Sequence, residues 1–328
     1  MTHDFGKKTT PHMLVQRWEE GHWLEAELRP YGPLSLDPLA KGLHYGQSVF
    51  EGMKAFRQPD GSVALFRPKD HLDRLAISAQ RLCMPAVEVD TLLGGLRDLI
   101  ALDLDHVPAP PASLYIRPLL FSDFGALVPE PSATHLLVCM LLPVGAYINR
   151  PDGLRLKTET ESVRAAPGGT GSTKCGGNYA GALQATMRAK AEGFDEVVWL
   201  DSGEHRYLEE VGTMNLFCVR GGRLITPPLS DTILPGITRR SVIALAHDRG
   251  IEVVEECISV HEGWGDIQEV LTCGTAVGVQ GVRELSHGGQ PLFAGKAMGP
   301  VTLRIAEALH DVRFGQTGDH PEWRLKIH

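Results

Sequence analysis

The chain has 328 residues, with 32 Lys and Arg against 40 Asp and Glu, which gives a formal net charge of −8. This length suffices for about two domains whose cores need no metal or disulfide staples. Hydrophobic residues at 43% and charged residues at 22% exclude a largely disordered or collagen-like chain. The negative balance argues against a general binder of nucleic acid or anionic membranes.

The cysteines and the apolar segments indicate the compartment. The six Cys are scattered and form no C-x-x-C pair, and the first ten residues are polar rather than leader-like. The longest apolar run, 136–148, contains Pro143 and is too short to span a bilayer. We therefore expect a soluble cytoplasmic protein with reduced thiols.

In the first half of the chain, β-like runs alternate with an amphipathic helix. Residues 49–56 and 62–66 predict a hairpin, because Asp60-Gly61 supplies the positive φ that a tight turn needs. A helix is predicted over 68–82, with Pro68 in its first turn. Its apolar face carries Leu72, Leu75, Ala76 and Ala79. Residues 113–121 and 135–142 are predicted strands, since both are rich in branched and aromatic residues.

Pro and Gly gather at 143–153 between two periodic segments, which predicts a domain boundary there. The sequence thus predicts an N-terminal α/β domain over 1–144, an interdomain loop over 145–153 and a C-terminal domain over 154–328.

The second half again alternates strands and helices, which predicts an α/β or α+β fold. The strands are expected at 154–159, 196–200, 215–219, 251–255 and 269–272. Helices are expected at 238–247, after Pro235-Gly236, and at 300–309. A further helix follows the Gly-rich loop 168–177, with Tyr179, Ala182, Leu183, Thr186 and Met187 on one face.

The Gly-rich loop GGTGSTKCGG at 168–177 contains a single lysine, Lys174. It is not a Walker A loop, because Thr173 precedes the lysine where Gly-Lys-Ser/Thr is required, and this weighs against a nucleotide-binding protein or kinase. No H-E-x-x-H or G-x-S-x-G string occurs, and the His spacing predicts no metal site. A lone lysine is usually a solvated loop residue, but one held in a desolvated pocket serves as an amine nucleophile or base.

Seven segments, in order along nearly the whole chain, resemble the branched-chain amino acid aminotransferases, which are fold-type-IV enzymes dependent on pyridoxal 5'-phosphate (PLP). They are LHYGQSVFEGMKAF (43–56), HLDRL (71–75), SLYIRPLL (113–120), TKCGGNYAG (173–181), EEVGTMNLF (209–217), TPPL with ILPGITR (226–239), and CGTA (273–276). The resemblance implies a smaller N-terminal α/β domain and a larger PLP-binding domain with a barrel-like sheet. It also implies a ping-pong transamination between L-leucine, L-isoleucine or L-valine and 2-oxoglutarate.

The resemblance assigns Lys174 as covalent anchor of PLP and as general acid/base. Arg74 would bind the phosphate, together with the helix start at Ile237 and Thr238, where free N–H groups form an anion site. Thr275 is a second candidate in that region, and Tyr179 would donate to the phenolic oxygen. Glu210 would face the pyridine nitrogen. Its neighbour Glu209 is a rival, although alternation in an extended strand puts the two on opposite faces and favours Glu210.

Substrate residues are also implied by the resemblance. The pocket must accept a branched aliphatic side chain and, in the other half-reaction, the distal carboxylate of glutamate. The walls would be Tyr45, Phe50, Tyr115 and Tyr147, with Arg117 as the carboxylate partner and the Thr275 and Ala276 N–H groups holding the α-carboxylate. The family forms at least homodimers, and a loop corresponding to the one around Leu127 closes the partner's pocket. A D-amino-acid transaminase or an aminodeoxychorismate lyase would share Lys174 and Glu210.

Overall fold

The protein is described from a computed structural model, which covers residues 6–145 and 150–327; residues 1–5, 146–149 and 328 lie outside the described part. The chain forms two compact units. The first consists of Met1–Tyr147, Thr173–Gly177 and Val312–His328, and the second of Ile148–Ser172 and Asn178–Asp311. The division predicted at 143–153 stays a prediction.

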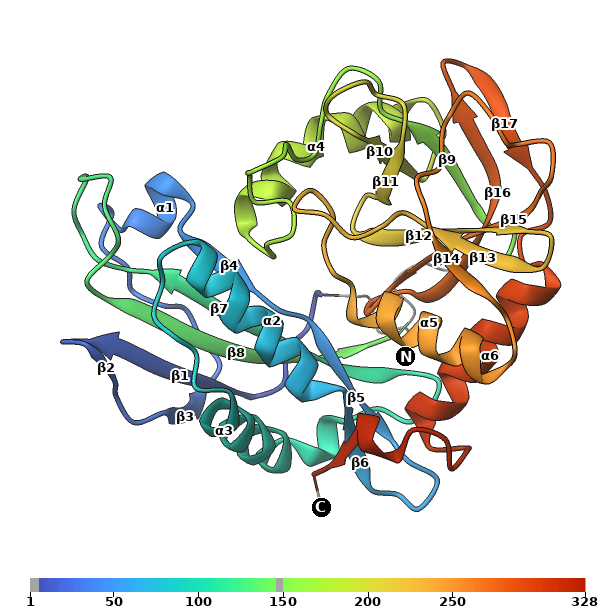
Figure 1. Cartoon of the computed structure of the whole chain (residues 1–328). Coiled ribbons are helices and arrows are strands. Elements are labelled where there is room, and N and C mark those ends of the chain that lie inside the picture. Colours follow the sequence, from blue (N-terminus) through green and yellow to red (C-terminus); the bar gives the residue numbers. More distant parts are fainter. Residues whose placement is uncertain (1–5, 146–149, 328) are drawn as a thin grey trace. The chain divides into compact units, whose positions relative to one another are not determined.

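The first unit contains an antiparallel sheet in the strand order β18-β6-β5-β7-β8-β1-β2, with β3 paired to β1 and β4 to β7 (Figure 1). Its strands are β1 (His12–Glu19), β2 (His22–Trp23), β3 (Glu27–Pro30), β4 (Ser48–Phe50), β5 (Met53–Arg57), β6 (Val63–Phe66), β7 (Ser113–Ser122), β8 (His135–Val144) and β18 (Arg324–Lys326). The two strands predicted at 113–121 and 135–142 are confirmed as β7 and β8, which pair along their whole length.

Helices cover one face of this sheet. They are α2 (Pro68–Arg81) and α3 (Val89–Leu102), beside the short α1 (Lys41–Tyr45) and the 3-10 turns Leu104–His106 and Pro321–Trp323. The predicted helix is confirmed as α2, with Pro68 in its first turn. Its residues Leu72, Leu75 and Ala79 are buried against Leu114 and Ile116 of β7 in one core. Because strand residues alternate, Tyr115 and Arg117 lie on the opposite face.

The predicted hairpin forms between β5 and β6, but the prediction of one strand from 49 to 56 was wrong. The strand is interrupted at Glu51-Gly52, and β4 pairs with the far part of β7. The Glu51 carboxylate turns toward α2, where it meets His71 and Arg74. A Cβ on Gly52 would lie 1.8 Å from the Tyr115 hydroxyl oxygen, so only glycine fits here. The interruption thus allows Glu51 to contact α2 and allows Tyr115 to approach Gly52 closely.

The second unit contains a sheet in the order β11-β10-β9-β16-β15-β12-β13-β14, and an additional β11–β12 pairing closes six of the strands into a barrel. The strands are β9 (Leu154–Thr158), β10 (Glu196–Leu200), β11 (Leu208–Val211), β12 (Met214–Arg220), β13 (Arg223–Thr226), β14 (Val253–Glu255), β15 (Ile267–Gly274), β16 (Gly278–His287) and β17 (Gln290–Ala294). The barrel-like sheet expected from the resemblance is therefore confirmed.

Three helices follow the predicted pattern: α4 (Gly176–Ala191), α5 (Ile237–Asp248) and α6 (Pro300–Phe314). In α4, the positions that face the core of the second unit are Ala185 and Ala189, which pack with Val197 and Trp199. Leu183 and Met187, on the face singled out in the sequence, are 63% and 61% exposed. Small residues let α4 lie close to the barrel. None of the helices in the described ranges is long and apolar enough to cross a membrane.

His135, at the start of β8, predicts how stability depends on pH. Its side chain is almost fully buried opposite Ser122, and neither ring nitrogen has a hydrogen-bond partner among the described residues. Burial lowers its pKa from 6.5 to about 4, although Asp123 opposes the shift. The unfolded ring therefore takes up a proton before the folded ring does. The free energy of unfolding should fall by up to about 3 kcal/mol as the pH drops through this interval.

Urea unfolding at pH 7 and at pH 4 tests this prediction. In His135→Leu, the free energy of unfolding should fall less between pH 7 and pH 4 than in the wild type. His22→Leu, at an exposed position, should show the same fall as the wild type. An unchanged pH dependence in His135→Leu would contradict the assignment.

Candidate active site

The Lys174 segment is fixed by backbone contacts within the first unit. Cys175 forms an isolated β-bridge with Val49, and the Phe50 N–H donates to the Lys174 carbonyl at 3.0 Å. On the other side, the Lys174 N–H donates to the Ser78 hydroxyl of α2 at 3.1 Å. The amine itself lies 5.0 Å from the centre of the Phe50 ring. The segment is therefore held in place independently of the lysine side chain.

Arg74 belongs to a buried cluster rather than to the protein surface. Its Nε and Nη2 donate to the two Glu51 carboxylate oxygens at 2.6 and 3.0 Å, and His71 Nδ1 lies 2.8 Å from the same carboxylate. Burial alone would raise the pKa of Glu51, but Arg74 and His71 together lower it well below its usual range. Burial also lowers the pKa of His71, and the Lys174 charge contributes to this shift. The cluster is thus electrostatically linked to the lysine.

Our sequence reasoning missed Glu51 and His71. The available signal was weak: His71 precedes Arg74 by one helical turn, and Glu51 is a charged residue inside an otherwise apolar predicted strand.

We predict a large loss of stability for Glu51→Gln. The side chain is completely buried, and removing its charge leaves the Arg74 guanidinium without its counter-ion. The free energy of unfolding of the cofactor-free protein should therefore fall by about 3 kcal/mol. Glu255→Gln is a matched control, because Glu255 accepts from Arg239 at 2.6 Å but is 47% exposed; its cost should stay below about 1 kcal/mol. Equal losses in the two variants would contradict the prediction.

Phe50, Tyr115 and Arg117 are brought together on the sheet face opposite α2 and α3. The Arg117 guanidinium carbon lies 4.7 Å from the Phe50 ring centre and 5.3 Å from that of Tyr115. Arg117 Nη2 also donates to the Tyr115 hydroxyl at 2.9 Å. Among the described residues, Arg117 Nε has no hydrogen-bond partner. The Lys174 amine and the Arg117 guanidinium therefore both lie near the Phe50 ring.

Tyr45 takes a different position. It is about half exposed at the end of α1, and its hydroxyl donates to the Leu127 carbonyl at 2.8 Å. Tyr45 thus belongs to the same surface as the loop between β7 and β8. Tyr147 lies outside the described residues.

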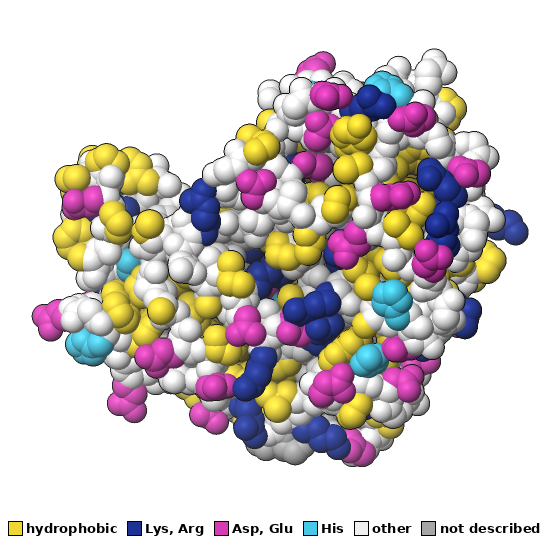
Figure 2. All heavy atoms as spheres, viewed as in Figure 1, with side chains coloured by type: hydrophobic (Ala, Val, Ile, Leu, Met, Phe, Trp, Pro, Cys, Tyr) yellow, Lys and Arg dark blue, Asp and Glu magenta, His cyan; other side chains and the backbone are white. Residues whose placement is uncertain are grey.

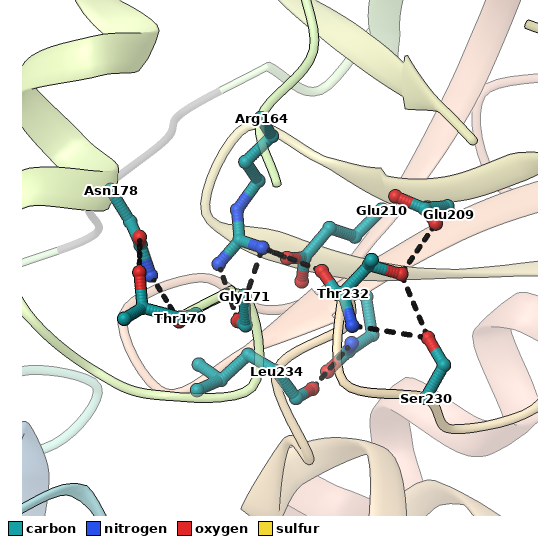
Figure 3. Close-up of polar contacts among 10 residues, drawn as sticks. Arg164, Thr170, Gly171, Asn178, Glu209, Glu210, Ser230, Thr232 and Leu234 are labelled. Carbon is teal, nitrogen blue, oxygen red and sulfur yellow. Dashed lines mark hydrogen bonds and ion pairs between the residues drawn. The ribbon is translucent and has the colours of Figure 1, made fainter. Parts of the chain in front are cut away.

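In the second unit, Glu210 is held by Arg164, which our sequence reasoning also missed (Figure 3). Arg164 Nη1 lies 2.5 Å from Glu210 Oε1, and both side chains are more than nine-tenths buried. Arg164 also donates to the carbonyls of Gly171 and Thr232, at 3.1 and 2.8 Å. One guanidinium therefore joins β11 to the loop that leads to Lys174 and to the loop that leads to α5.

The rival Glu209 makes a different set of contacts. It accepts a hydrogen bond from the Thr232 hydroxyl at 2.5 Å, and its carboxylate is drawn apart from that of Glu210 in Figure 3. Burial raises the pKa of Glu209. The two neighbouring carboxylates thus lie in different electrostatic surroundings.

Strand register places the start of α5 and the 274–276 turn at the same end of the barrel as Glu210. Glu210 pairs with Asn215 of β12, and Asn215 pairs with Cys273 of β15. Asn215 Nδ2 donates to the Leu234 carbonyl at 3.1 Å. A Cβ on Gly236 would lie 1.9 Å from Asn215 Oδ1, so glycine is required directly before the helix. Asn215 is a further positioning residue that the sequence reasoning missed.

The remaining predicted residues of the second unit surround this end of the barrel or begin α4. Ile237 and Thr238 open α5 with Gly236 as N-cap, and the first N–H groups of a helix have no partner within it. Thr275 and Ala276 form the turn between β15 and β16, and both are partly buried. Tyr179 is partly buried in the first turns of α4. A helix start of this kind favours phosphate.

Taken separately, the first unit holds a lysine amine and a buried arginine, and the second holds a helix N-terminus and a buried carboxylate paired with an arginine. These are the kinds of group that PLP requires, and together with a closed barrel they are typical of a PLP-dependent transferase.

Comparisons with known proteins agree with this class. Residues 48–285 match the family described as amino-transferase class IV. The chain is 42% identical to the branched-chain-amino-acid aminotransferase of Mycolicibacterium smegmatis, over 98% of this chain and 92% of that protein. The solved branched-chain amino acid aminotransferase of Escherichia coli superposes with a TM-score of 0.82 at 30% identity, over 97% of this chain and all of that one.

A third match is a branched-chain amino acid aminotransferase solved in complex with N-(5'-phosphopyridoxyl)-L-glutamate. It superposes with a TM-score of 0.79 at 31% identity, over 95% of this chain and 98% of that one. The chain therefore belongs to the class IV aminotransferase family, within its branched-chain amino acid aminotransferases.

Proposed function

We propose that this enzyme transfers the amino group of L-leucine, L-isoleucine or L-valine to 2-oxoglutarate, and catalyses the reverse reaction, with PLP as cofactor. The observation that carries the proposal is the Lys174 amine, which is fixed over Phe50 and electrostatically linked to the Arg74 cluster. The matching relatives bear the name of this activity.

The residues proposed to hold PLP fit its chemical groups. Arg74 is orientated by Glu51 and presents a guanidinium suited to phosphate. Ile237 and Thr238 would offer helix N–H groups and Thr275 a turn for the same anion, while Tyr179 would donate to the phenolic oxygen. Glu210, which is paired with Arg164, would accept a hydrogen bond from the pyridinium N–H. When bound, PLP supplies an electron-withdrawing ring that stabilises negative charge on the substrate Cα.

Lys174 would anchor the cofactor, and its freed amine would act as the base that removes the proton from the substrate Cα and as the acid that delivers it to the C4′ carbon of the cofactor. Phe50 supplies an apolar surface beneath the amine.

Substrate recognition is assigned to the opposite sheet face of the first unit and to the 274–276 turn. Phe50, Tyr115 and Tyr147 would contact the branched side chain. Arg117, whose Nε has no hydrogen-bond partner among the described residues, would bind the distal carboxylate of glutamate. The N–H groups of Thr275 and Ala276 would hold the α-carboxylate.

An assay of L-leucine against D-alanine with 2-oxoglutarate tests the proposed function. We expect L-leucine to be strongly preferred. A preference for D-alanine would favour a D-amino-acid transaminase of the same fold, and release of pyruvate from aminodeoxychorismate would favour the lyase.

We also propose a cytoplasmic homodimer in which the segment 123–130 closes the partner's pocket. The support is an exposed apolar cluster over α1 and this segment, visible as yellow spheres at the upper left of Figure 2. It consists of Leu39, Leu43, Tyr45, Phe124, Leu127 and Val128, which are 37% to 64% exposed. Exposed apolar patches of this kind are typical of interfaces. A sedimentation measurement that finds only monomer would contradict the dimer. For the compartment, the support is that none of the described cysteines forms a disulfide.

A further inference from the structure

A lysine with almost no solvent exposure lies beneath the segment 123–130. Lys41, in α1, is 1% exposed and is among the largest fully buried side chains of the protein. Burying an ammonium is costly unless hydrogen bonds and nearby charges compensate for the lost water. Its contacts should therefore show why the chain keeps a lysine there.

Among the described residues, the compensating contacts of the ammonium come from that one segment. Nζ donates to the Glu130 carbonyl at 3.1 Å and lies 3.6 Å from the Glu130 carboxylate. It also lies 5.7 Å from the centre of the Phe124 ring. The ammonium thus touches both ends of the segment.

Backbone contacts add to this attachment. The Lys41 N–H donates to the Phe124 carbonyl at 3.2 Å, and Ala40 forms an isolated β-bridge with Gly125. Tyr45 stands four residues after Lys41, on the same helical face, and its hydroxyl bonds the Leu127 carbonyl in the middle of the segment. Figure 1 shows α1 beside the loop that joins β7 and β8.

We propose that Lys41 is a positioning residue that fastens the segment 123–130 onto α1, beside Tyr45, and so fixes Leu127 for the partner's substrate pocket. This inference rests on the proposed function of that segment. Leu127 and Tyr45 are exposed, so burial within the subunit does not fix their positions. The buried Lys41 ammonium fixes them instead. Lys41 acts through Leu127 and Tyr45 and does not touch substrate.

The test compares the PLP-loaded wild type with Lys41→Met. This change keeps a long, unbranched side chain but removes the positive charge and the hydrogen-bond donor. Hydrogen exchange of the peptide covering 123–130 should become about tenfold faster, as expected for the loss of a charged hydrogen bond. The KM for 2-oxoglutarate should rise about tenfold while kcat changes little, because the cofactor residues are untouched. Lys69→Met is the matched control, since Lys69 is 66% exposed in the same unit.

Unchanged exchange in Lys41→Met would overturn the fastening, and faster exchange with an unchanged KM would overturn its role in substrate binding. Lys41→Gln keeps a donor without the charge and should give intermediate values; it replaces Lys41→Met if that variant does not fold. Leu127→Ala separates this inference from the proposed function. If that change leaves the KM for 2-oxoglutarate unaltered, the segment does not serve the partner's pocket, whatever Lys41 does.

Discussion

Lys174→Ala should lower the rate of transamination by at least about 10³-fold, because the variant loses both the covalent anchor and the proton-transferring amine. Its fold should be intact. The two hydrogen bonds that fix the segment involve the Lys174 N–H and carbonyl, which alanine retains. Initial rates with L-leucine and 2-oxoglutarate measure the loss, and the visible absorbance of the protein with added PLP reports whether a covalent bond to the lysine still forms.

Lys54, a buried lysine of the same unit, makes the comparison sharper. Burial, with a contribution from the Arg313 charge, lowers the pKa of Lys54 to about 7. By its pKa alone, Lys54 would be the more obvious amine nucleophile of the first unit. Its position on β5 differs, since it pairs with Tyr115 rather than with the Lys174 segment.

Lys54→Met should keep the visible absorbance of bound PLP, and Lys174→Ala should lose it. Partial rescue of Lys174→Ala by a small primary amine in solution would identify the missing group as an amine. If Lys54→Met loses the absorbance and Lys174→Ala keeps it, the roles assigned to the two lysines are reversed.

Much of the fold follows from local sequence patterns. The Asp60-Gly61 turn, the apolar face of α2 and the Pro235-Gly236 entry to α5 are each encoded within a few residues, and each is found at its expected place. The interruption at Glu51-Gly52 was not predictable in this way. Its causes are His71 and Arg74 on a helix, and Tyr115 on a neighbouring strand, which are distant in sequence.

In the candidate site, too, some residues could be predicted from the sequence and others depend on contacts that are distant in sequence. Residue types and the resemblance identified Lys174, Arg74 and Glu210, because such groups carry the chemistry directly. Arg164, Asn215 and Lys41 act on other residues through contacts across 46, 19 and 89 positions. Their own neighbours in the sequence do not reveal those contacts. Tyr45 and Phe50 illustrate a related limit, since they stand five residues apart yet contact different parts of the first unit.

Glu209 and Glu210 offer the sharpest comparison in the second unit, because two adjacent buried carboxylates differ mainly in their partners. Glu210 meets the Arg164 guanidinium, and Glu209 accepts from the Thr232 hydroxyl. An ionised carboxylate can keep a pyridine nitrogen protonated, whereas one whose pKa is raised, as burial does for Glu209, is less suited to that task.

Glu210→Gln should therefore lower kcat for the L-leucine half-reaction about a hundredfold, by analogy with the loss of one preorganised electrostatic group. Binding of PLP should change little, since its phosphate contacts remain. The protein should stay folded, because Arg164 keeps its bonds to the Gly171 and Thr232 carbonyls. Glu209→Gln should stay within about threefold of the wild type, since an amide oxygen can still accept from Thr232. A larger loss in Glu209→Gln than in Glu210→Gln would make Glu209 the partner of the ring nitrogen, and the assignment based on Arg164 would then be wrong.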